Sequence, residues 1–226
     1  MYAAVNTFAL VLASIFPVVN PPGSALVFLG LTSGATPEMR ATLARRIALN
    51  SLILLVCSFL LGALILQFYG ISVPILRVAG GIIVAVSGWK LLNEGSDKEL
   101  DATGDVSRGN LLDQAFYPLT LPLTTGPGSI AIVISIGLSE ATITSPGERI
   151  VFVLASLLAI TVLSLAILFC FTYADRIQKL LGRGGTDIAV RLSAFILFCL
   201  GLQILWSGAN DLLTSVLSAS VRPSVP

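Results

Sequence analysis

Apolar runs separated by short polar intervals make up most of this chain. Six of these runs approach or exceed the length of about 20 residues that a helix needs to cross the hydrocarbon of a bilayer. They cover Val5–Leu31, Ile47–Phe68, Pro74–Leu92, Leu111–Leu138, Ile150–Tyr173 and Ile188–Gly208. The pattern therefore predicts an all-α membrane protein with six transmembrane helices.

The longest polar interval divides the chain into halves. Residues 93–110 are rich in Gly, Asp and Glu, and they are predicted to form a cytoplasmic loop between a three-helix unit at 1–92 and another at 111–213. Residues 214–226 are predicted to be a frayed C-terminal tail. No Asp, Glu or His is expected in the interior of a span, so a carboxylate proton relay has no candidate.

The two halves repeat each other. A shift of 105 residues places four residues of the first span on identical residues of the fourth: Pro17 on Pro122, Pro22 on Pro127, Gly23 on Gly128, and Ser24 on Ser129. A shift of 114 residues pairs Gly70 with Gly184 and Arg77 with Arg191 at the start of the third and sixth spans. Each half holds an odd number of spans, so the second would enter the membrane upside down. Such inverted three-helix repeats are typical of secondary transporters.

The first and fourth spans are predicted to be discontinuous helices. A proline inside a helix removes a backbone donor and clashes with the preceding turn, and Asn20 and Pro21 both precede prolines. Non-helical backbone at membrane depth is tolerated only inside protein or beside a polar cavity. Half-helices that restart at Pro22 and Pro127 would present unpaired amides and a positive dipole end to an anion.

These two breaks define a candidate substrate-binding site. Its predicted residues are Asn20, Pro21, Pro22, Gly23, Ser24, Thr124, Thr125, Gly126, Pro127, Gly128 and Ser129. The half-helix ends and serine hydroxyls would donate to a carboxylate, whereas Asn20, the threonines and unwound carbonyls would accept from an ammonium group. A small zwitterion matches this inventory. Glycine at positions 23, 126 and 128 would allow close backbone approach, so Gly128→Leu is predicted to abolish transport without preventing insertion.

Composition narrows the class and charge gives an orientation. The chain is 55% hydrophobic and 11% charged, with a mean hydropathy of +0.95, whereas soluble domains carry roughly 25% charged residues. A net charge of +1 gives no argument for nucleic-acid binding, and three cysteines in apolar runs without histidine identify neither a metal site nor a cofactor. Ten of the thirteen Lys and Arg residues fall on one side of the predicted spans. Both termini are therefore predicted to be extracytoplasmic.

Three motifs carry a family resemblance. They are the break Asn20–Gly23 with the Phe-Leu-Gly-Leu-Thr run Phe28–Thr32, the Pro-Leu-rich stretch Pro118–Gly128, and the stretch Gly70–Gly81. Together they resemble the MarC family of bacterial inner-membrane proteins, over about Phe8 to Gly208. The resemblance implies six spans, an inner-membrane location and similarity to transporters of small neutral amino acids.

The leading hypothesis is a secondary transporter of an alanine- or glycine-like amino acid, working by alternating access and coupled to H+ or Na+. The alternative is an exporter or channel for another small solute or drug, although the spans are too uniformly apolar to suggest a polar pore. An enzyme is not expected, because a nucleophilic Ser24 or Ser129 would lack an adjacent base. The expected partners are the substrate and the lipid bilayer.

Overall fold

The computed structural model describes residues 2–32, 34–102, 112–139 and 143–220, and every regular element in these ranges is a helix. The predicted all-α class is confirmed. In these ranges five helical stretches are long and apolar enough to cross a bilayer. The bent pair Asp113–Thr124 and Pro127–Ser139 makes a sixth candidate span.

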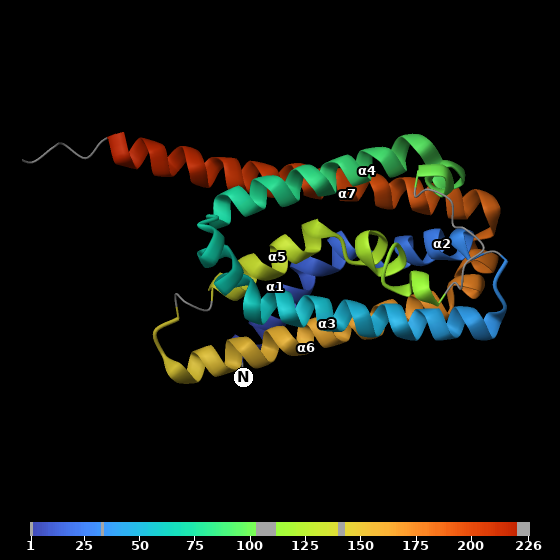
Figure 1. The fold of residues 1–226 in the computed structure, drawn as a ribbon, viewed down its shortest axis with the longest axis horizontal. Helices are drawn as coiled ribbons and strands as arrows, with labels where there is room; N and C mark the ends of the chain where they lie inside the picture. Colours follow the sequence, from blue (N-terminus) through green and yellow to red (C-terminus); the bar gives the residue numbers. More distant parts are fainter. Residues whose placement is uncertain (1, 33, 103–111, 140–142, 221–226) are drawn as a thin grey trace, which may run out of the picture.

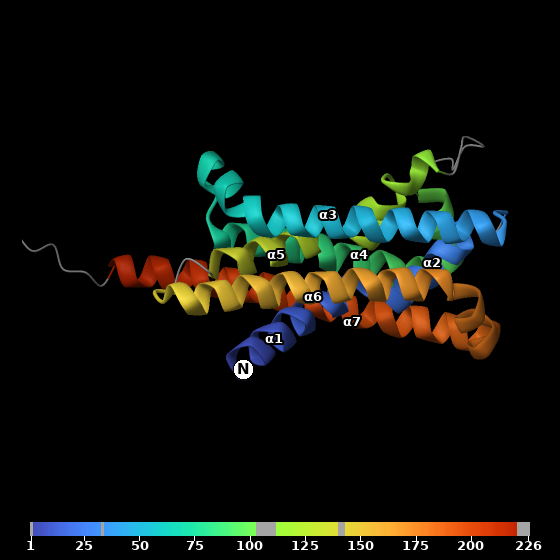
Figure 2. The same ribbon diagram turned by 90° about the horizontal axis from the view of Figure 1, so that it is seen from below.

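The helices lie in layers (Figure 1, Figure 2). One outer layer is the pair α4 (Val73–Ala102) and α7 (Ala174–Ser220), and the opposite layer contains α3 (Pro37–Tyr69) and α6 (Pro146–Thr172). The short helices lie between them: α1 (Tyr2–Val19), α2 (Pro21–Leu31) and α5 (Pro127–Ser139). α2 contacts both α6 and α7, whereas α5 contacts both α3 and α4. The broken spans are therefore held between the two outer layers.

Glycines bring α4 and α7 into backbone contact along their length. A Cβ added at Gly81 would lie 2.8 Å from the Gly201 carbonyl oxygen, and one at Gly88 would lie 2.9 Å from the Ala194 carbonyl oxygen. Gly208 approaches the Pro74 carbonyl in the same way, at 2.7 Å. The glycines recur every seven residues on each helix, at 81 and 88 and at 201 and 208. This repeat keeps the small residues on one seam of two long helices, as in coiled coils.

The core lies on the other side of the broken spans. Ile15, Leu43, Leu55 and Leu163 are fully buried there, and Phe28 of α2 packs on Phe171 of α6 with ring centroids 4.8 Å apart. The outward faces of α3 and α6 expose large apolar side chains, among them Leu49, Ile53, Leu64, Ile150, Leu154 and Leu165. Such faces suit hydrocarbon rather than water, as expected of a membrane bundle.

Two predicted boundaries are wrong. α4 continues to Ala102, so the first part of the predicted loop 93–110 is helical, and residues 103–111 lie outside the described residues. Glu, Lys and Leu in this stretch are good helix formers, although the stretch as a whole is polar. α7 continues to Ser220, so most of the predicted tail 214–226 is helical, and only 221–226 lie outside the description. Leu213, Val216 and Leu217 prolong its apolar helical pattern.

The sequence pattern also did not predict that a carboxylate lies in the long C-terminal helix. The candidate span nearest the C-terminus runs from Gly184 to Leu217 and contains Asp211, which accepts a hydrogen bond of 2.7 Å from Nη1 of Arg77 on α4. The predicted span ended at Gly208, so the sequence pattern placed Asp211 just outside it, whereas the helix continues past this residue. The ion pair offsets part of the desolvation penalty that otherwise excludes such a residue.

Candidate functional site

The first break is a single residue wide. Asn20 adopts a left-handed conformation (φ 47°, ψ 62°), which asparagine tolerates better than most residues. Its side-chain Oδ1 accepts from the Gly23 amide at 3.3 Å, and its carbonyl accepts from the Ser24 amide at 2.9 Å. Pro21 begins α2, one residue before the predicted restart at Pro22.

The cap leaves no unpaired amide at the start of α2. Pro21 and Pro22 have no N–H, and both following amides are bonded to Asn20. The expectation of free amides at this half-helix is therefore wrong. Because the Gly23 amide is taken by Asn20, the Val19 carbonyl loses its helical partner, and the Ser24 hydroxyl donates to it at 3.0 Å.

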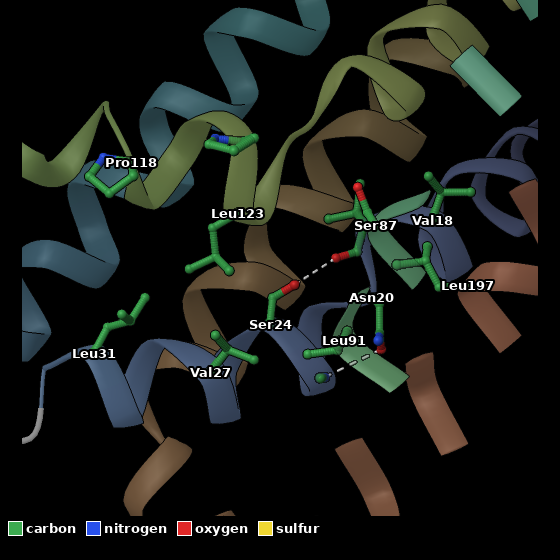
Figure 3. A pocket seen from close by; sticks show the side chains of 13 residues that line it. Val18, Asn20, Ser24, Val27, Leu31, Ser87, Leu91, Pro118, Leu123 and Leu197 are labelled. Atoms are coloured by element: carbon green, nitrogen blue, oxygen red, sulfur yellow. Dashed lines mark hydrogen bonds between the residues drawn. The ribbon is translucent and has the colours of Figure 1, made fainter. Parts of the chain in front are cut away.

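A small cavity lies beside this break. It has a volume of about 150 Å³ and is bounded by α2, α4, α7 and the segment before the second break. Three polar side chains reach it, those of Asn20, Ser24 and Ser87 (Figure 3). The apolar part of its wall includes Val18, Val27, Leu91, Pro118, Leu123 and Leu197. We call this space the Asn20 cavity.

The hydrogen bonds already made fix what these side chains can offer a ligand. Asn20 uses Oδ1 in the helix cap, while its Nδ2 group donates no hydrogen bond within the described residues. Ser24 and Ser87 donate their protons to the carbonyls of Val19 and Ile83, at 3.0 and 2.8 Å. The amide nitrogen is thus a free donor and both hydroxyls are free acceptors. A donor for a carboxylate and acceptors for an ammonium group share one cavity.

The second break is wider and sharper. In η2 (Leu119–Thr124) the Thr125 amide donates to the carbonyl of Thr120, five residues back, at 2.8 Å. The chain then bends by 71° before α5 begins at Pro127. The Thr120 and Thr124 hydroxyls donate to the carbonyls of Ala115 and Leu119. Each hydroxyl thus satisfies the carbonyl five residues before it, where the regular helical ladder is interrupted.

The polar side chains of the second break already donate hydrogen bonds to other groups of the protein. The fully buried Thr125 hydroxyl donates to the Ser51 hydroxyl of α3 at 2.9 Å. The Ser129 hydroxyl donates to the Gly126 carbonyl at 2.8 Å. The amides of Gly128 and Ser129 have no hydrogen-bond partner in the described part of the chain. The prediction of unpaired amides thus applies to α5 alone.

Gly128 is a packing position. A Cβ there would collide with Val84 of α4 and lie 3.5 Å from the Gly80 carbonyl oxygen. Gly128→Leu would therefore force α4 and α5 apart, so the variant predicted from the sequence tests helix packing as well as binding.

The structure brings together only part of the predicted site. Asn20, Gly23 and Ser24 line the Asn20 cavity, whereas Pro21 is buried outside its wall and Pro22 is exposed. The second motif contributes none of its predicted residues, which were Thr124, Thr125, Gly126, Pro127, Gly128 and Ser129. The cavity is lined instead by three earlier residues of the same motif, Pro118, Pro122 and Leu123. Those two prolines were visible in the sequence motif, but nothing in the sequence singles out Ser87 or Leu197.

A second cavity lies on the other side of the break. It has a volume of about 400 Å³ and is lined by α1, α4, α5 and α7, with Arg77, Ser135 and Gln203 in its wall. Val18 lines both cavities. We call this second space the Arg77 cavity. The two spaces are therefore neighbours along the bundle, with the Val18 side chain between them.

Comparison with known proteins gives a consistent result. A family model described as MarC family integral membrane protein matches residues 5–213. The inner membrane protein MarC of Salmonella paratyphi A is 30% identical over 209 residues, covering 89% of this chain and 93% of that protein. A membrane protein of Archaeoglobus fulgidus is 30% identical over 203 residues, covering 90% and 92%, and the MarC protein of Escherichia coli O1:K1 is 29% identical over 210 residues, covering 89% and 93%. No solved structure matches.

Proposed function

Because this chain belongs to the MarC family of integral membrane proteins, we propose that it is a secondary transporter of small neutral amino acids. The observation that carries the proposal is the Asn20 cavity, in which one free amide donor and two free hydroxyl acceptors lie at a break in a membrane-spanning helix. Broken helices at corresponding positions of two halves are characteristic binding sites of transporters.

The size of the cavity favours a small substrate. A cavity of about 150 Å³ in another protein holds benzene, which has six heavy atoms, and zwitterionic alanine also has six. Leucine has nine and would not fit a cavity of about 150 Å³ without movement of the wall. The same argument disfavours a bulky drug in this conformation. Glycine and alanine are therefore the substrates that we expect first.

The cavity chemistry supports a zwitterion. The Nδ2 group of Asn20 would donate to the substrate carboxylate, and Ser24 and Ser87 would accept from its ammonium group. No charged side chain lines the Asn20 cavity among the residues described. A net-neutral ligand with internal charge separation suits such a wall better than a monovalent ion, whose desolvation would be uncompensated.

Two inverted repeats and alternating access complete the proposal. The arrangement of the helices supports it, because α1–α2 runs opposite to η2–α5, α3 opposite to α6, and α4 opposite to α7 (Figure 1). The glycine seam would make α4 and α7 move as a unit against α3 and α6. The Asn20 and Arg77 cavities would then be reached from opposite sides, with Val18 as the barrier between them.

The basic residues orient this scheme. Arg40 and Arg176 lie near the starts of α3 and α7, which meet at one end of the bundle. Arg77 and Arg149 lie near the starts of α4 and α6, at the other end (Figure 1). We place the first end in the cytoplasm, which puts both termini outside it. The Asn20 cavity extends toward Leu31 and Leu91 and would be the cytoplasmic one.

The test is uptake of radiolabelled alanine by proteoliposomes containing the purified protein, under an imposed proton or sodium gradient. We expect saturable uptake of alanine that unlabelled glycine inhibits strongly and leucine inhibits weakly. The ion whose gradient drives this uptake is the coupling ion. Uptake of alanine under neither gradient, by protein shown to be folded, would contradict the proposal and favour an exporter of another small solute.

A matched pair of serines isolates the cavity. Ser87 and Ser58 both donate to the carbonyl four residues earlier, at 2.8 and 2.7 Å, but only Ser87 lines the Asn20 cavity. Ser87→Ala should raise the KM for alanine by about tenfold to 100-fold, the effect of losing one hydrogen bond to a charged group. Ser58→Ala should leave the KM unchanged. Equal effects of the two substitutions would contradict a role for Ser87.

A further inference from the structure

The Arg77 cavity contains an unusual side chain for a membrane-spanning region. Arg77 lies on α4, in the candidate span Val73–Asn93, and is the one charged residue among those described in the cavity wall. An arginine at this position is costly, and within membranes such residues are usually functional. It also belongs to the motif Gly70–Gly81, for which the Asn20 cavity gives no role.

Neighbouring side chains hold the guanidinium in a fixed orientation. Its Nε donates to the Ser135 hydroxyl of α5 at 3.0 Å, and its Nη1 donates to one oxygen of Asp211 of α7 at 2.7 Å. Asp211 is not part of the cavity wall, whereas Arg77 and Ser135 are. The carboxylate therefore holds the arginine without itself facing the cavity.

The groups that remain are donors. The Nη2 group of Arg77 makes no hydrogen bond with the described residues, and the Ser135 hydroxyl accepts from Arg77 but donates to none of them. Gln203 and Ser207 in the same wall also make no hydrogen bond within the described residues, so an amide group and a hydroxyl are free there. Because Asp211 already pairs with Arg77, the guanidinium contributes free donors rather than net charge, and Nη2 with the neighbouring hydroxyls can bond the oxygens of a carboxylate.

We propose that the Arg77 cavity is a second binding site, which takes the carboxylate group of a small organic acid through Arg77 and Ser135. Where that acid is the transported amino acid, an extension that rests on the proposed function, the site receives the substrate on the other side of Val18. The carboxylate would exchange Arg77 for the amide of Asn20 as it passes Val18. Arg77 then contributes to specificity for acids over amines.

The experiment uses acetate, which carries the carboxylate and no ammonium group. Saturation-transfer NMR of its methyl protons reports weak binding to the purified full-length protein. We expect saturable transfer for acetate, and none for ethylamine of similar size. An absence of acetate binding to the folded protein would overturn the proposal.

Paired substitutions separate recognition from structure. Arg77→Gln together with Asp211→Asn removes the guanidinium without leaving an unpaired carboxylate, so the fold should survive. Acetate binding should weaken by about tenfold or more. The control is Arg40→Gln with Asp175→Asn, which removes a different interhelical ion pair, and it should bind acetate normally. Unchanged binding by the first double variant, or an equal loss in the second, would overturn the proposal.

Ser135→Ala gives an independent readout. This substitution leaves the Arg77–Asp211 pair in place and removes the hydroxyl donor, so acetate should bind about tenfold to 100-fold more weakly. Normal affinity in this variant would contradict the part assigned to Ser135. Acetate binding does not require transport. If acetate binds at Arg77 but alanine is not taken up, the binding site is supported and the proposed function fails. If alanine is taken up but acetate does not bind, the proposed function is supported and the site at Arg77 fails.

Discussion

The two helix breaks begin alike in sequence and end differently in structure. At the first, one residue, Asn20, caps α2 with its own side chain, and its remaining polar group faces a cavity. At the second, wide turns and a 71° bend place Thr125 against α3, where its hydroxyl is buried and bonded. Prolines thus favour a break, whereas the partners of the polar residue at the break decide whether its side chain lines a cavity or anchors the bundle.

The serines of the outer helices show the same contrast. The shift of 105 residues that aligns the two breaks also pairs Asn20 with Thr125 and Ser51 of α3 with Ser156 of α6. Ser51 accepts the Thr125 hydroxyl, whereas the fully buried Ser156 hydroxyl has no partner among the described residues. One half makes an interaction that the other leaves open. Inverted repeats in different conformations, as alternating access requires, would differ in this way.

The largest effect should come from Asn20→Asp. The aspartate keeps an oxygen to cap the Gly23 amide and places a negative charge at a helix N-terminus, which is favourable. It loses the Nδ2 donor and repels a carboxylate, so alanine uptake should fall by about 100-fold. Thermal unfolding should occur at or above the wild-type temperature.

Asn20→Ala separates the two roles of the residue. It removes both the cap and the donor but adds no repelling charge, so it should lower the free energy of unfolding by about 1 kcal/mol and lower uptake less than Asn20→Asp does. Normal uptake by the Asp variant would remove Asn20 from the site, and wild-type stability of the Ala variant would contradict the cap.

An intermediate effect is expected at the second break. Ser51→Ala leaves the buried Thr125 hydroxyl without its acceptor and should lower the free energy of unfolding by about 1–3 kcal/mol. Thr125→Val should do the same from the other side. The double variant should recover much of the loss, because replacing both partners by apolar groups can be nearly neutral. Additive losses in chemical denaturation would show that the two hydroxyls do not interact.

The smallest effect should come from Ser156→Ala. Since this buried hydroxyl has no partner, its removal should leave the free energy of unfolding unchanged or raise it by less than about 1 kcal/mol. Denaturation alongside Ser51→Ala makes the comparison direct. A loss as large as that of Ser51→Ala would mean that the two halves are equivalent and would contradict the contrast drawn between them.

The spans and both breaks could be predicted because they depend on local chemistry. Apolar length predicts a span, and the prolines at the two breaks disfavour helical backbone just before them. A single proline is not a sufficient signal, because Pro17 lies inside α1. The ends of the helices were harder to predict from the sequence. α3 begins at Pro37 instead of near Ile47, since Thr36 caps Met39 and extends the helix beyond its apolar run.

The site was only half predictable for a different reason. Asn20 and Ser24 could be identified because they lie at the break itself. Which hydroxyls remain available depends on contacts between distant segments, such as that of Thr125 with Ser51, and a single sequence does not show these. Ser87 and Leu197 enter the cavity only because the glycine seam sets the position of α4 against α7. Asp211 was missed because its partner, Arg77, lies on another helix.

The most direct test of a zwitterion site at Asn20 is displacement of labelled alanine from the purified protein at equilibrium. Glycine carries both charged groups, propionate only the carboxylate, and alanine methyl ester only the ammonium group. We predict that glycine displaces alanine, and that the other two displace it at least about tenfold more weakly, because each leaves a donor or an acceptor of the cavity unpaired. Displacement by propionate or by the methyl ester as strong as that by glycine would contradict the zwitterion site.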